Sequence, residues 1–410
     1  MNLRPFHGYR YGIGRARDVS KVVAPPYDQI SPETQERLCA MSPENIVRVT
    51  LPQEAPPVDR YRRACEVLDR WLADGVWTRE ASPAIYPYHQ TYTVAGGSIT
   101  RMGFVALGEV TDYRWGVVLP HERTHAGPKR DRMKLLEATA ADIGLLFMLT
   151  SDPSGELLGA TAPAGSPIAE ARDLKGEHHA LWRITEGDAI ARVQKLMAER
   201  QVIIADGHHR YETAVEYRKL HPEATHKLMA FFALEAPGLT ILPNHRLVHQ
   251  VAGWSFDGLR SAAREWFDVK PLPDPLAFGP TSREIGVVSG DEAAVFTLRD
   301  DAVARVPWPP STSHAWRKLS VSILHEALLK PHLDITDAKL DAKTHVEYTA
   351  DQAEAVALAR EGRYQAAFLI APTTPAELQD IVRGGELLPQ KSTHFYPKLL
   401  DGLVFYRLGE

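Results

Sequence analysis

The residues with the most chemistry in one place are Asp206-Gly207-His208-His209-Arg210, near the middle of the sequence. The two imidazoles and the guanidinium are hydrogen-bond donors, and glycine lets a ligand oxygen approach the backbone closely. These residue types together suit an anion, most naturally phosphate. Asp206 is the exception, because a carboxylate repels phosphate. It would make sense if it binds a metal ion, orients a histidine, or takes a proton from a hydroxyl.

The sequence around this group predicts a strand before it and a helix after it. Residues 202–205 form an apolar, mostly β-branched run that is typical of a buried strand, and Asp206-Gly207 is a turn signal. Residues 211–220 carry apolar side chains at helical spacing. A helix start offers unpaired N–H groups and the positive end of the dipole, which favours an anion. The alternative is an ordinary N-cap at Asp206 with solvated histidines.

A second dense polar group precedes a helix that we expect over 133–141. Its members combine acid–base chemistry with phosphate-binding charge; they are His121, Glu122, Thr124, His125, Lys129, Asp131 and Arg132. His121 and His125 have the spacing of zincin ligands, but Pro120 and Gly127-Pro128 argue against the helix that such a site needs. A solvated basic loop is the alternative reading of this segment.

Two further segments could contribute to a site. Pro25-Pro26 ends an apolar run in a rigid loop, from which Tyr27 and Asp28 would project, unless the loop is only a structural turn. The second segment lies near the end of the sequence and offers several donors in a row; they are Gln390, Lys391, Ser392 and Thr393, with Lys398 as an added charge. Apolar residues between 395 and 405 indicate that this segment packs against the protein.

A chain of 410 residues predicts more than one domain. We expect an N-terminal α+β domain at 1–150, a core at 167–250, a peripheral α/β unit at 251–310, and a C-terminal α/β segment at 311–410 that completes the site. Among the shorter elements, Ile46–Thr50 is predicted as a strand. Gly96-Gly97 predicts a hairpin, and Thr374-Pro375 predicts a helix start.

Composition excludes several classes of protein. A net charge of −5 and a pI near 6.4 argue against broad nucleic-acid binding. Two cysteines, Cys39 and Cys65, make neither a disulfide framework nor a cysteine zinc site, and they suit a reducing cytoplasm. We find neither an apolar run of membrane-spanning length nor a signal-peptide core at the start. The sequence therefore favours a cytoplasmic protein that does not bind membranes.

The sequence also resembles known families. At full length it resembles domain-of-unknown-function family 1015, whose hallmarks here are residues 24–28, 121–124, 129–132, 205–211 and 388–398. The Asp206–Arg210 turn is similar to the phosphate-binding turn of the ParB/sulfiredoxin superfamily, and most of all to its free serine kinases. This resemblance implies an α+β fold with a ParB/sulfiredoxin-like core and added α/β domains. It also implies a transferase that moves phosphate from a nucleotide to the hydroxyl of L-serine.

We therefore expect a small-molecule kinase that uses ATP or ADP and Mg²⁺, with a metabolite hydroxyl, such as that of free L-serine, as acceptor. The roles divide into four sets. Donor phosphates would be bound by Gly207, His208, His209, Arg210, Lys129, Arg132, Lys391, Ser392 and Thr393. The catalytic residues would be Asp206, which is also the Mg²⁺ ligand, together with Glu122 and His209. The acceptor would contact Tyr27, Asp28, His121 and Thr124.

Two other functions stay open at this point. One is a nucleotide-binding regulator or a DNA-associated protein, as other ParB-like domains are. The other is a phosphohydrolase, in which water replaces the acceptor hydroxyl. Neither the oligomeric state nor the acceptor follows from the sequence.

Overall fold

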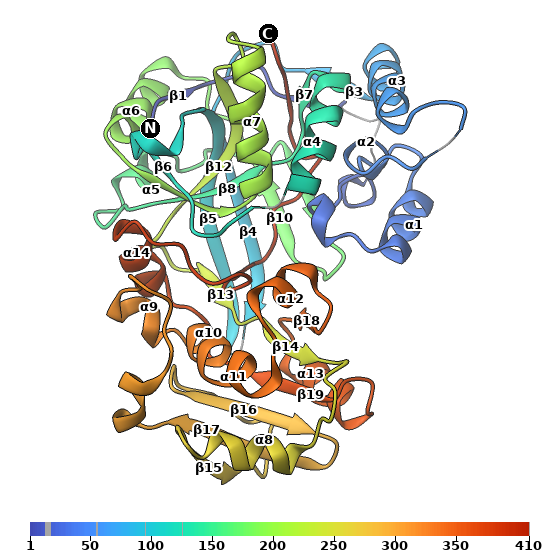
Figure 1. Ribbon diagram of the computed structural model, residues 1–410. Coiled ribbons are helices and arrows are strands. Elements are labelled where there is room, and N and C mark those ends of the chain that lie inside the picture. Colours follow the sequence, from blue (N-terminus) through green and yellow to red (C-terminus); the bar gives the residue numbers. More distant parts are fainter. Residues whose placement is uncertain (13–17, 55, 95, 125, 410) are drawn as a thin grey trace. The chain divides into compact units, whose positions relative to one another are not determined.

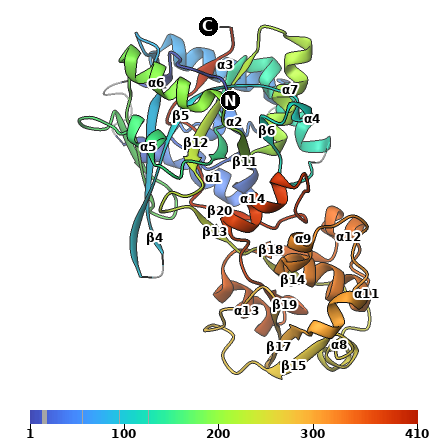
Figure 2. The same cartoon turned by 90° about the vertical axis from the view of Figure 1, so that its left-hand side faces the viewer.

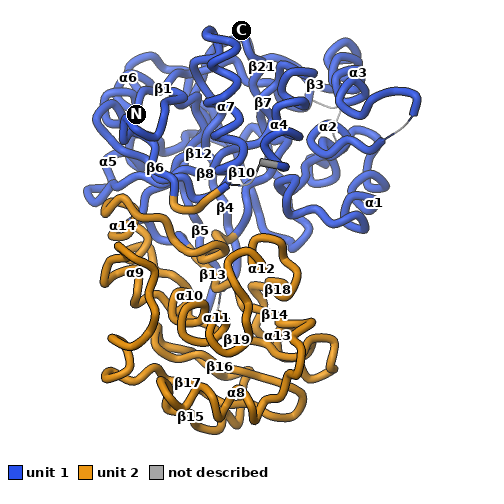
Figure 3. Tube along the Cα trace, viewed as in Figure 1, with its two compact units in different colours: residues 1–120, 124–239, 397–410 blue, residues 121–123, 240–396 orange. Residues whose placement is uncertain are grey.

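The computed structural model describes residues 1–12, 18–54, 56–94, 96–124 and 126–409. The chain divides into two compact units, which Figure 3 shows in different colours. Unit 1 comprises Met1–Pro120, Thr124–Leu239 and Pro397–Glu410, and unit 2 comprises His121–Arg123 and Thr240–Tyr396. Of the four predicted segments, 1–150 and 167–250 fall mainly in unit 1, 251–310 falls in unit 2, and 311–410 is divided between them. The division into four domains stays a prediction.

Unit 1 is built on a mixed sheet of nine strands among the described residues, in the order β6-β11-β8-β12-β5-β4-β10-β9, with β1 paired to β5. The strands are β1 (Leu3–Arg4), β4 (Tyr86–Val94), β5 (Gly97–Glu109), β6 (Val118–Leu119), β8 (Leu146–Thr150), β9 (Ala169–Arg172), β10 (His178–Leu181), β11 (Val202–Asp206) and β12 (His226–Ala233). Figure 2 shows β4 and β5 as a long hairpin, and this confirms the hairpin predicted at Gly96-Gly97.

Helices of unit 1 pack on this sheet and on each other. They are α1 (Pro32–Met41), α2 (Val47–Thr50), α3 (Arg60–Ala73), α4 (Ala126–Thr139), α5 (Glu156–Ala160), α6 (Gly187–Ala198) and α7 (His208–Leu220), with 3-10 helices at Val19–Lys21, Tyr27–Gln29 and Tyr113–Trp115. Helices α4 and α7 lie side by side (Figure 1). Smaller strands pair β2 (Tyr9–Tyr11) with β3 (Trp77–Arg79) and β7 (Ala141–Asp142) with β21 (Tyr406–Arg407).

The central strand–turn–helix unit forms as its hydrophobic pattern predicts. Strand β11 pairs in parallel with β6 and antiparallel with β8, and its apolar residues Val202, Ile203 and Ile204 are buried. Helix α7 begins at His208, directly after Gly207. The first helical turn therefore carries both histidines and Arg210 at the end of a buried strand.

The last residues of the chain complete unit 1. Asp401 and Ala24 exchange two backbone hydrogen bonds of 2.8 and 3.1 Å, and Tyr9 pairs with Phe405 in the same way. Leu399, Leu400, Leu403, Val404 and Phe405 are all buried, which confirms the prediction that this segment packs against the protein. Hydrogen bonding to Ala24 places Asp401 near the 3-10 helix that begins at Tyr27.

Unit 2 contains a six-stranded sheet among its described residues, in the order β15-β17-β16-β19-β14-β18. These strands are β14 (His245–Val248), β15 (Phe267–Pro271), β16 (Glu284–Ser289), β17 (Glu292–Leu298), β18 (Val346–Thr349) and β19 (Ala366–Leu369), and β13 (Thr240–Leu242) pairs separately with β20 (His394–Tyr396). Its helices are α8 (Phe256–Ala263), α9 (His314–Lys318), α10 (Ser320–Ile323), α11 (Lys330–Leu333), α12 (Asp337–Ala342), α13 (Gln352–Arg360) and α14 (Pro375–Arg383), with a 3-10 helix at Asp300–Arg305 and a π-helix at Leu324–Leu329.

Two predicted elements were wrong. The segment predicted as a strand at Ile46–Thr50 is helical, because the Asn45 side chain accepts a hydrogen bond from the Val47 amide and donates to Val23 and Lys21. These contacts override the β propensity of the valines. Helix α4 begins at Ala126 and not at Met133. Pro128 is tolerated there because the first turn of a helix leaves its N–H groups unpaired in any case.

Helices and strands occur together in both units, which confirms the expected α+β class. Among the described residues, no helix combines the length and the apolar character needed to cross a membrane.

Phe405 tests how the end of the chain holds unit 1 together. Its ring is fully buried, with its centroid 5.0 Å from that of Tyr9 and 4.6 Å from that of Trp77. We expect Phe405→Ala to lower the free energy of unfolding by about 3–5 kcal/mol in denaturant titrations, because it removes contacts and leaves a cavity. Leu220→Ala, at a side chain that is 65% exposed, should change it by less than about 0.5 kcal/mol. Equal effects would contradict the packing described.

Candidate functional site

The turn between β11 and α7 depends on a glycine. Gly207 is the N-cap of α7 with φ of 101°, and no side chain caps the helix. A Cβ at this position would lie 2.7 Å from Cδ2 of Leu146 and 3.1 Å from Nη2 of Arg210. The amides of the first turn are thus left without a capping side chain, and Leu146 and Arg210 pack closely against the glycine.

Asp206 forms an ion pair with a lysine from the end of the chain. Its Oδ2 lies 3.1 Å from Nζ of Lys398, and the two side chains are 19% and 18% exposed. Burial alone would raise the pKa of Asp206, but the positive charges of Lys398, Arg210 and His208 lower it below the ordinary value. Asp206 is therefore ionised over the physiological pH range, and its charge is balanced by cations.

Arg210 is the buried cation of the turn. Its side chain is 8% exposed, and Nη1 donates a 2.6 Å hydrogen bond to the Leu145 carbonyl. Burial opposes its charge, but Asp206, Asp401 and Asp28 outweigh burial and raise the pKa of Arg210. His208 beside it is buried and His209 is half-buried. The structure thus brings Asp206, Gly207, His208, His209 and Arg210 together as predicted, although their functional roles stay a prediction.

Lys129 and Thr124 both contact Glu212, an acid for which the sequence predicts no role. Nζ of Lys129 lies 2.8 Å from Oε2 of Glu212, and the Thr124 hydroxyl donates to the same oxygen at 2.6 Å. Glu212 lies on α7, one turn after the histidines. The only sequence signal for it is its place on that helix.

Arg132 is likewise paired within unit 1. It donates to Asp131 through Nη2 at 2.5 Å and to the Thr50 carbonyl through Nη1 at 2.6 Å. Its guanidinium carbon lies 4.0 Å from the centre of the Tyr27 ring, a cation–π contact. Burial and the neighbouring Asp28 raise the pKa of Tyr27. Asp28 itself is exposed.

The other predicted residues lie in unit 2. Nε2 of His121 and the Thr393 hydroxyl are 2.9 Å apart, so the structure brings these two together. Lys391 has a positive φ of 57°, and its carbonyl accepts hydrogen bonds from Asn244 and Arg246. The Ser392 hydroxyl donates to the Pro389 carbonyl, and Glu122 is half-buried. Because these residues and the turn belong to different units, their common site stays a prediction. His125 lies outside the described residues.

The surroundings of Asp206 do not suit a metal ion held by the protein. Its carboxylate is paired with Lys398 and flanked by Arg210, so two cations already compensate its charge. No group of three or more potential ligand side chains occurs within the part of the chain that the structure describes. This pairing does not favour Asp206 as a Mg²⁺ ligand, and the metal-binding role predicted for it stays a prediction.

Together, the fold and the turn define an α+β protein in which a helix without a side-chain cap starts at the end of a central strand. More particularly, the chain belongs to the family described as "Protein of unknown function (DUF1015)", whose sequence profile matches residues 3–322. The family membership inferred from the sequence is confirmed. No curated protein resembles the chain closely enough to count as a match.

Several solved structures are similar to this chain at low identity. A conserved hypothetical protein from Pyrococcus furiosus has 13% identity and a TM-score of 0.40, over 74% of this chain and 95% of that chain. A free serine kinase variant in complex with ADP has 12% identity and a TM-score of 0.38, over 71% and 87% of the two chains. C-terminally truncated SbnI from Staphylococcus aureus has 12% identity and a TM-score of 0.38, over 72% and 85%. These TM-scores lie below 0.5, so the similarity carries no information about function.

Gly207→Ala should damage the turn. The substitution places a side chain at a φ of 101° and drives its Cβ against Leu146. We expect a loss of about 1–3 kcal/mol in the free energy of unfolding, from backbone strain, together with weaker phosphate binding. Gly159→Ala is the control, since nothing lies within 4 Å of its Cβ position in helix α5 and helix propensity favours alanine. A Gly207→Ala protein as stable as the control would contradict the geometry.

Lys398→Met should leave Asp206 without its main counter-charge. The lowered pKa means that ionised Asp206 stabilises the fold above its unfolded pKa of about 3.9, and that this contribution is lost as pH falls through the folded pKa. We expect a loss of about 1–3 kcal/mol at pH 7, measured by denaturant unfolding. The difference in free energy of unfolding between the wild type and Lys398→Met should become smaller below about pH 4.

Lys398→Arg keeps the charge and serves as the control for the Lys398→Met protein. It should retain most of the stability at pH 7. A gap between the wild type and Lys398→Met that does not change with pH would count against the ion pair.

Proposed function

We propose that this protein is a small-molecule kinase that transfers a phosphate from ATP or ADP to a metabolite hydroxyl. The observation that carries the proposal is the uncapped start of α7, where the N-cap is Gly207 and Arg210 is buried alongside. Backbone amides, the helix dipole and a guanidinium converge there on one point, which is the environment that binds the phosphates of a nucleotide.

The residues of the turn would act mainly through charge and position. In phosphoryl transfer the protein gains most by holding the reactants in line and by stabilising the charge on the transferred group. The α7 amides, His208, His209 and Arg210 would bind the donor phosphates. The acceptor oxygen would form a bond to phosphorus while the bond to the bridging oxygen breaks, and the shortened nucleotide would leave with the electron pair.

Asp206 is better suited to positioning than to proton transfer. Its lowered pKa makes it a weak base near neutral pH, and its pairing with Lys398 holds a second cation beside the turn. We propose that it fixes Lys398 and Arg210 for the phosphates. Magnesium would then arrive as the counter-ion of the nucleotide phosphates rather than as a ligand of Asp206.

Phosphate transfer is tested by incubating the protein with ATP or ADP and a panel of hydroxyl metabolites, and by measuring nucleotide consumption and phosphorylated product. Arg210→Lys keeps one positive charge but loses the planar fork that binds phosphate through two bonds. We expect kcat/KM to fall about 10- to 100-fold, which corresponds to about 1.4–2.7 kcal/mol of transition-state stabilisation.

Arg218→Lys, in the last turn of α7, is the matched control for Arg210→Lys and should leave kcat/KM unchanged. Release of inorganic phosphate without any acceptor would instead indicate a phosphohydrolase. Nucleotide binding without consumption would indicate a regulator, and either result would overturn the kinase proposal.

A further inference from the structure

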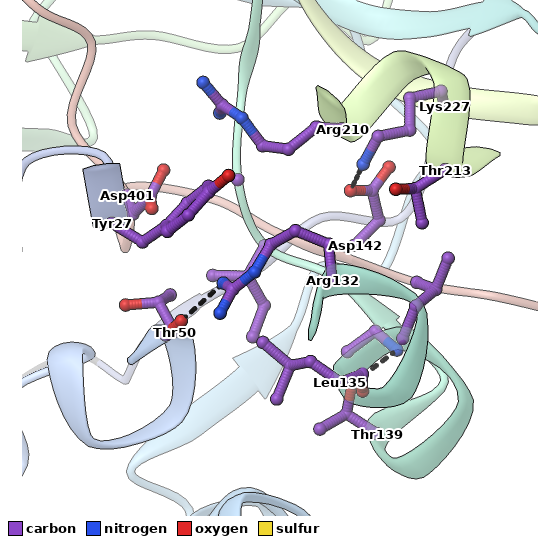
Figure 4. Close-up of a pocket in the computed structure, with 14 residues that line it drawn as sticks. Tyr27, Thr50, Arg132, Leu135, Thr139, Asp142, Arg210, Thr213, Lys227 and Asp401 are labelled. Atoms are coloured by element: carbon purple, nitrogen blue, oxygen red, sulfur yellow. Dashed lines mark hydrogen bonds and ion pairs between the residues drawn. The ribbon is translucent and has the colours of Figure 1, made fainter. Parts of the chain in front are cut away.

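A small cavity lies in unit 1 beside Arg210. Its volume is about 60 Å³, and its walls come from distant parts of the chain (Figure 4). Tyr27 comes from the 3-10 helix at Tyr27–Gln29, Arg132 from α4, Arg210 from α7, and Asp401 from the last residues of the chain. The sequence predicts phosphate or acceptor binding for Tyr27, Arg132 and Arg210, and it predicts no role for Asp401.

Asp401 lines the cavity and has a carboxylate oxygen that accepts no hydrogen bond from the described residues. It is 3% exposed, and among the described residues its Oδ1 has no hydrogen-bond partner. Lys227 is paired with Asp142, and Arg132 donates to Asp131 and Thr50. A buried carboxylate oxygen without a partner is costly, so a ligand that donates a hydrogen bond would satisfy it.

The surroundings of Asp401 also suit exchange of a proton. Burial raises the pKa of Asp401 to about 7, although Arg210 and Arg132 oppose this effect and Asp28 adds to it. Lys227, on β12, also interacts with its charge. A group that titrates near neutral pH can both accept and release a proton, as a general base must.

Arg210 connects the cavity to the phosphate turn. Its pKa responds to Asp206 in the turn and to Asp401 in the cavity, so both carboxylates lie within electrostatic reach of one guanidinium. A Cβ added at Gly144 would lie 3.2 Å from Nη1 of Arg210 and 3.8 Å from Oδ1 of Asp401. A ligand in the cavity would therefore be a neighbour of phosphates bound at the turn.

We propose that this cavity holds the phosphate acceptor and that Asp401 is the general base of the transfer, an inference that rests on the proposed kinase function. The acceptor hydroxyl donates its hydrogen bond to Oδ1 of Asp401. As the hydroxyl oxygen bonds to the terminal phosphorus of the nucleotide, its proton passes to Asp401. The bond to the bridging oxygen breaks, the nucleotide leaves with that electron pair, and Asp401 then releases the proton to solvent.

Size and charge restrict the class of acceptor. A water needs roughly 10–15 Å³ of such volume, so the cavity has room for about four to six waters, or a ligand of similar size. Arg132 and Lys227 are already neutralised by Asp131 and Asp142. A ligand with net negative charge would be repelled by the carboxylates around Arg210 and by the phosphates of the bound nucleotide. The acceptor is therefore a compact alcohol without net negative charge, a class that includes glycerol and zwitterionic L-serine.

The test compares the wild type with Asp401→Asn, which keeps the shape of the side chain but cannot accept the proton. Nucleotide binding, measured by calorimetry with ATP and ADP, should stay within about twofold. Transfer to glycerol or L-serine should fall by about 100-fold or more, the usual contribution of a general base. The acid limb of the pH–rate profile near pH 7 should disappear in the variant. Asp69→Asn, at a side chain that is 58% exposed, should leave transfer unchanged.

The outcomes separate this inference from the kinase proposal. Transfer by Asp401→Asn within tenfold of the wild type would overturn the role of Asp401 while the kinase proposal stands. A preference for D-glycerate over L-serine, or equal nucleotide consumption with L-serine and L-alanine, would overturn the acceptor class. Absence of transfer by the wild type to every alcohol, with nucleotide still bound, would overturn both proposals.

Discussion

The chemistry of the turn depends on one ion pair between residues that are 192 positions apart, Asp206 and Lys398. Without the lysine, a partly buried carboxylate would stand where phosphate is expected, and it would repel that phosphate. With the lysine in place, the acid is ionised and held among cations. The paired carboxylate no longer leaves an uncompensated negative charge at the helix start, and it holds Lys398 and Arg210 there.

Local sequence patterns were sufficient for much of the fold. The strand at 202–206 and the helix after it follow from hydrophobic periodicity and a single glycine, because both depend on neighbours in the sequence. The predicted cap at Thr374 is present with its reciprocal hydrogen bonds to Glu377. Prediction failed where a distant contact decided the backbone. The Asn45 side chain turns the valines after it into a helix by bonding to Lys21 and Val23, and no local pattern encodes those partners.

The candidate site divides in the same way. The cluster from Asp206 to Arg210 could be predicted because its members are consecutive. The charge of Lys129 and Arg132 could also be predicted, but their pairing with Glu212 and Asp131 could not, since the sequence does not show which cations are already neutralised. The sequence shows Asp401 only as a single acid among leucines and a valine. Its place beside Tyr27 follows from the backbone bridge to Ala24, which the sequence does not reveal.

Unit 1 takes its first residues and its last residues from opposite ends of the sequence, with the residues of unit 2 between them. This arrangement has a consequence for synthesis on the ribosome. Domains generally fold as units during translation, with the N-terminal one first. Here Lys398 and Asp401 emerge only after the whole of unit 2 has been made. A nascent chain therefore cannot form the contacts of Asp206 and Arg210 with these two residues early. A prematurely terminated polypeptide would carry Asp206 and Gly207 without Lys398, and would therefore lack the ion pair at the turn.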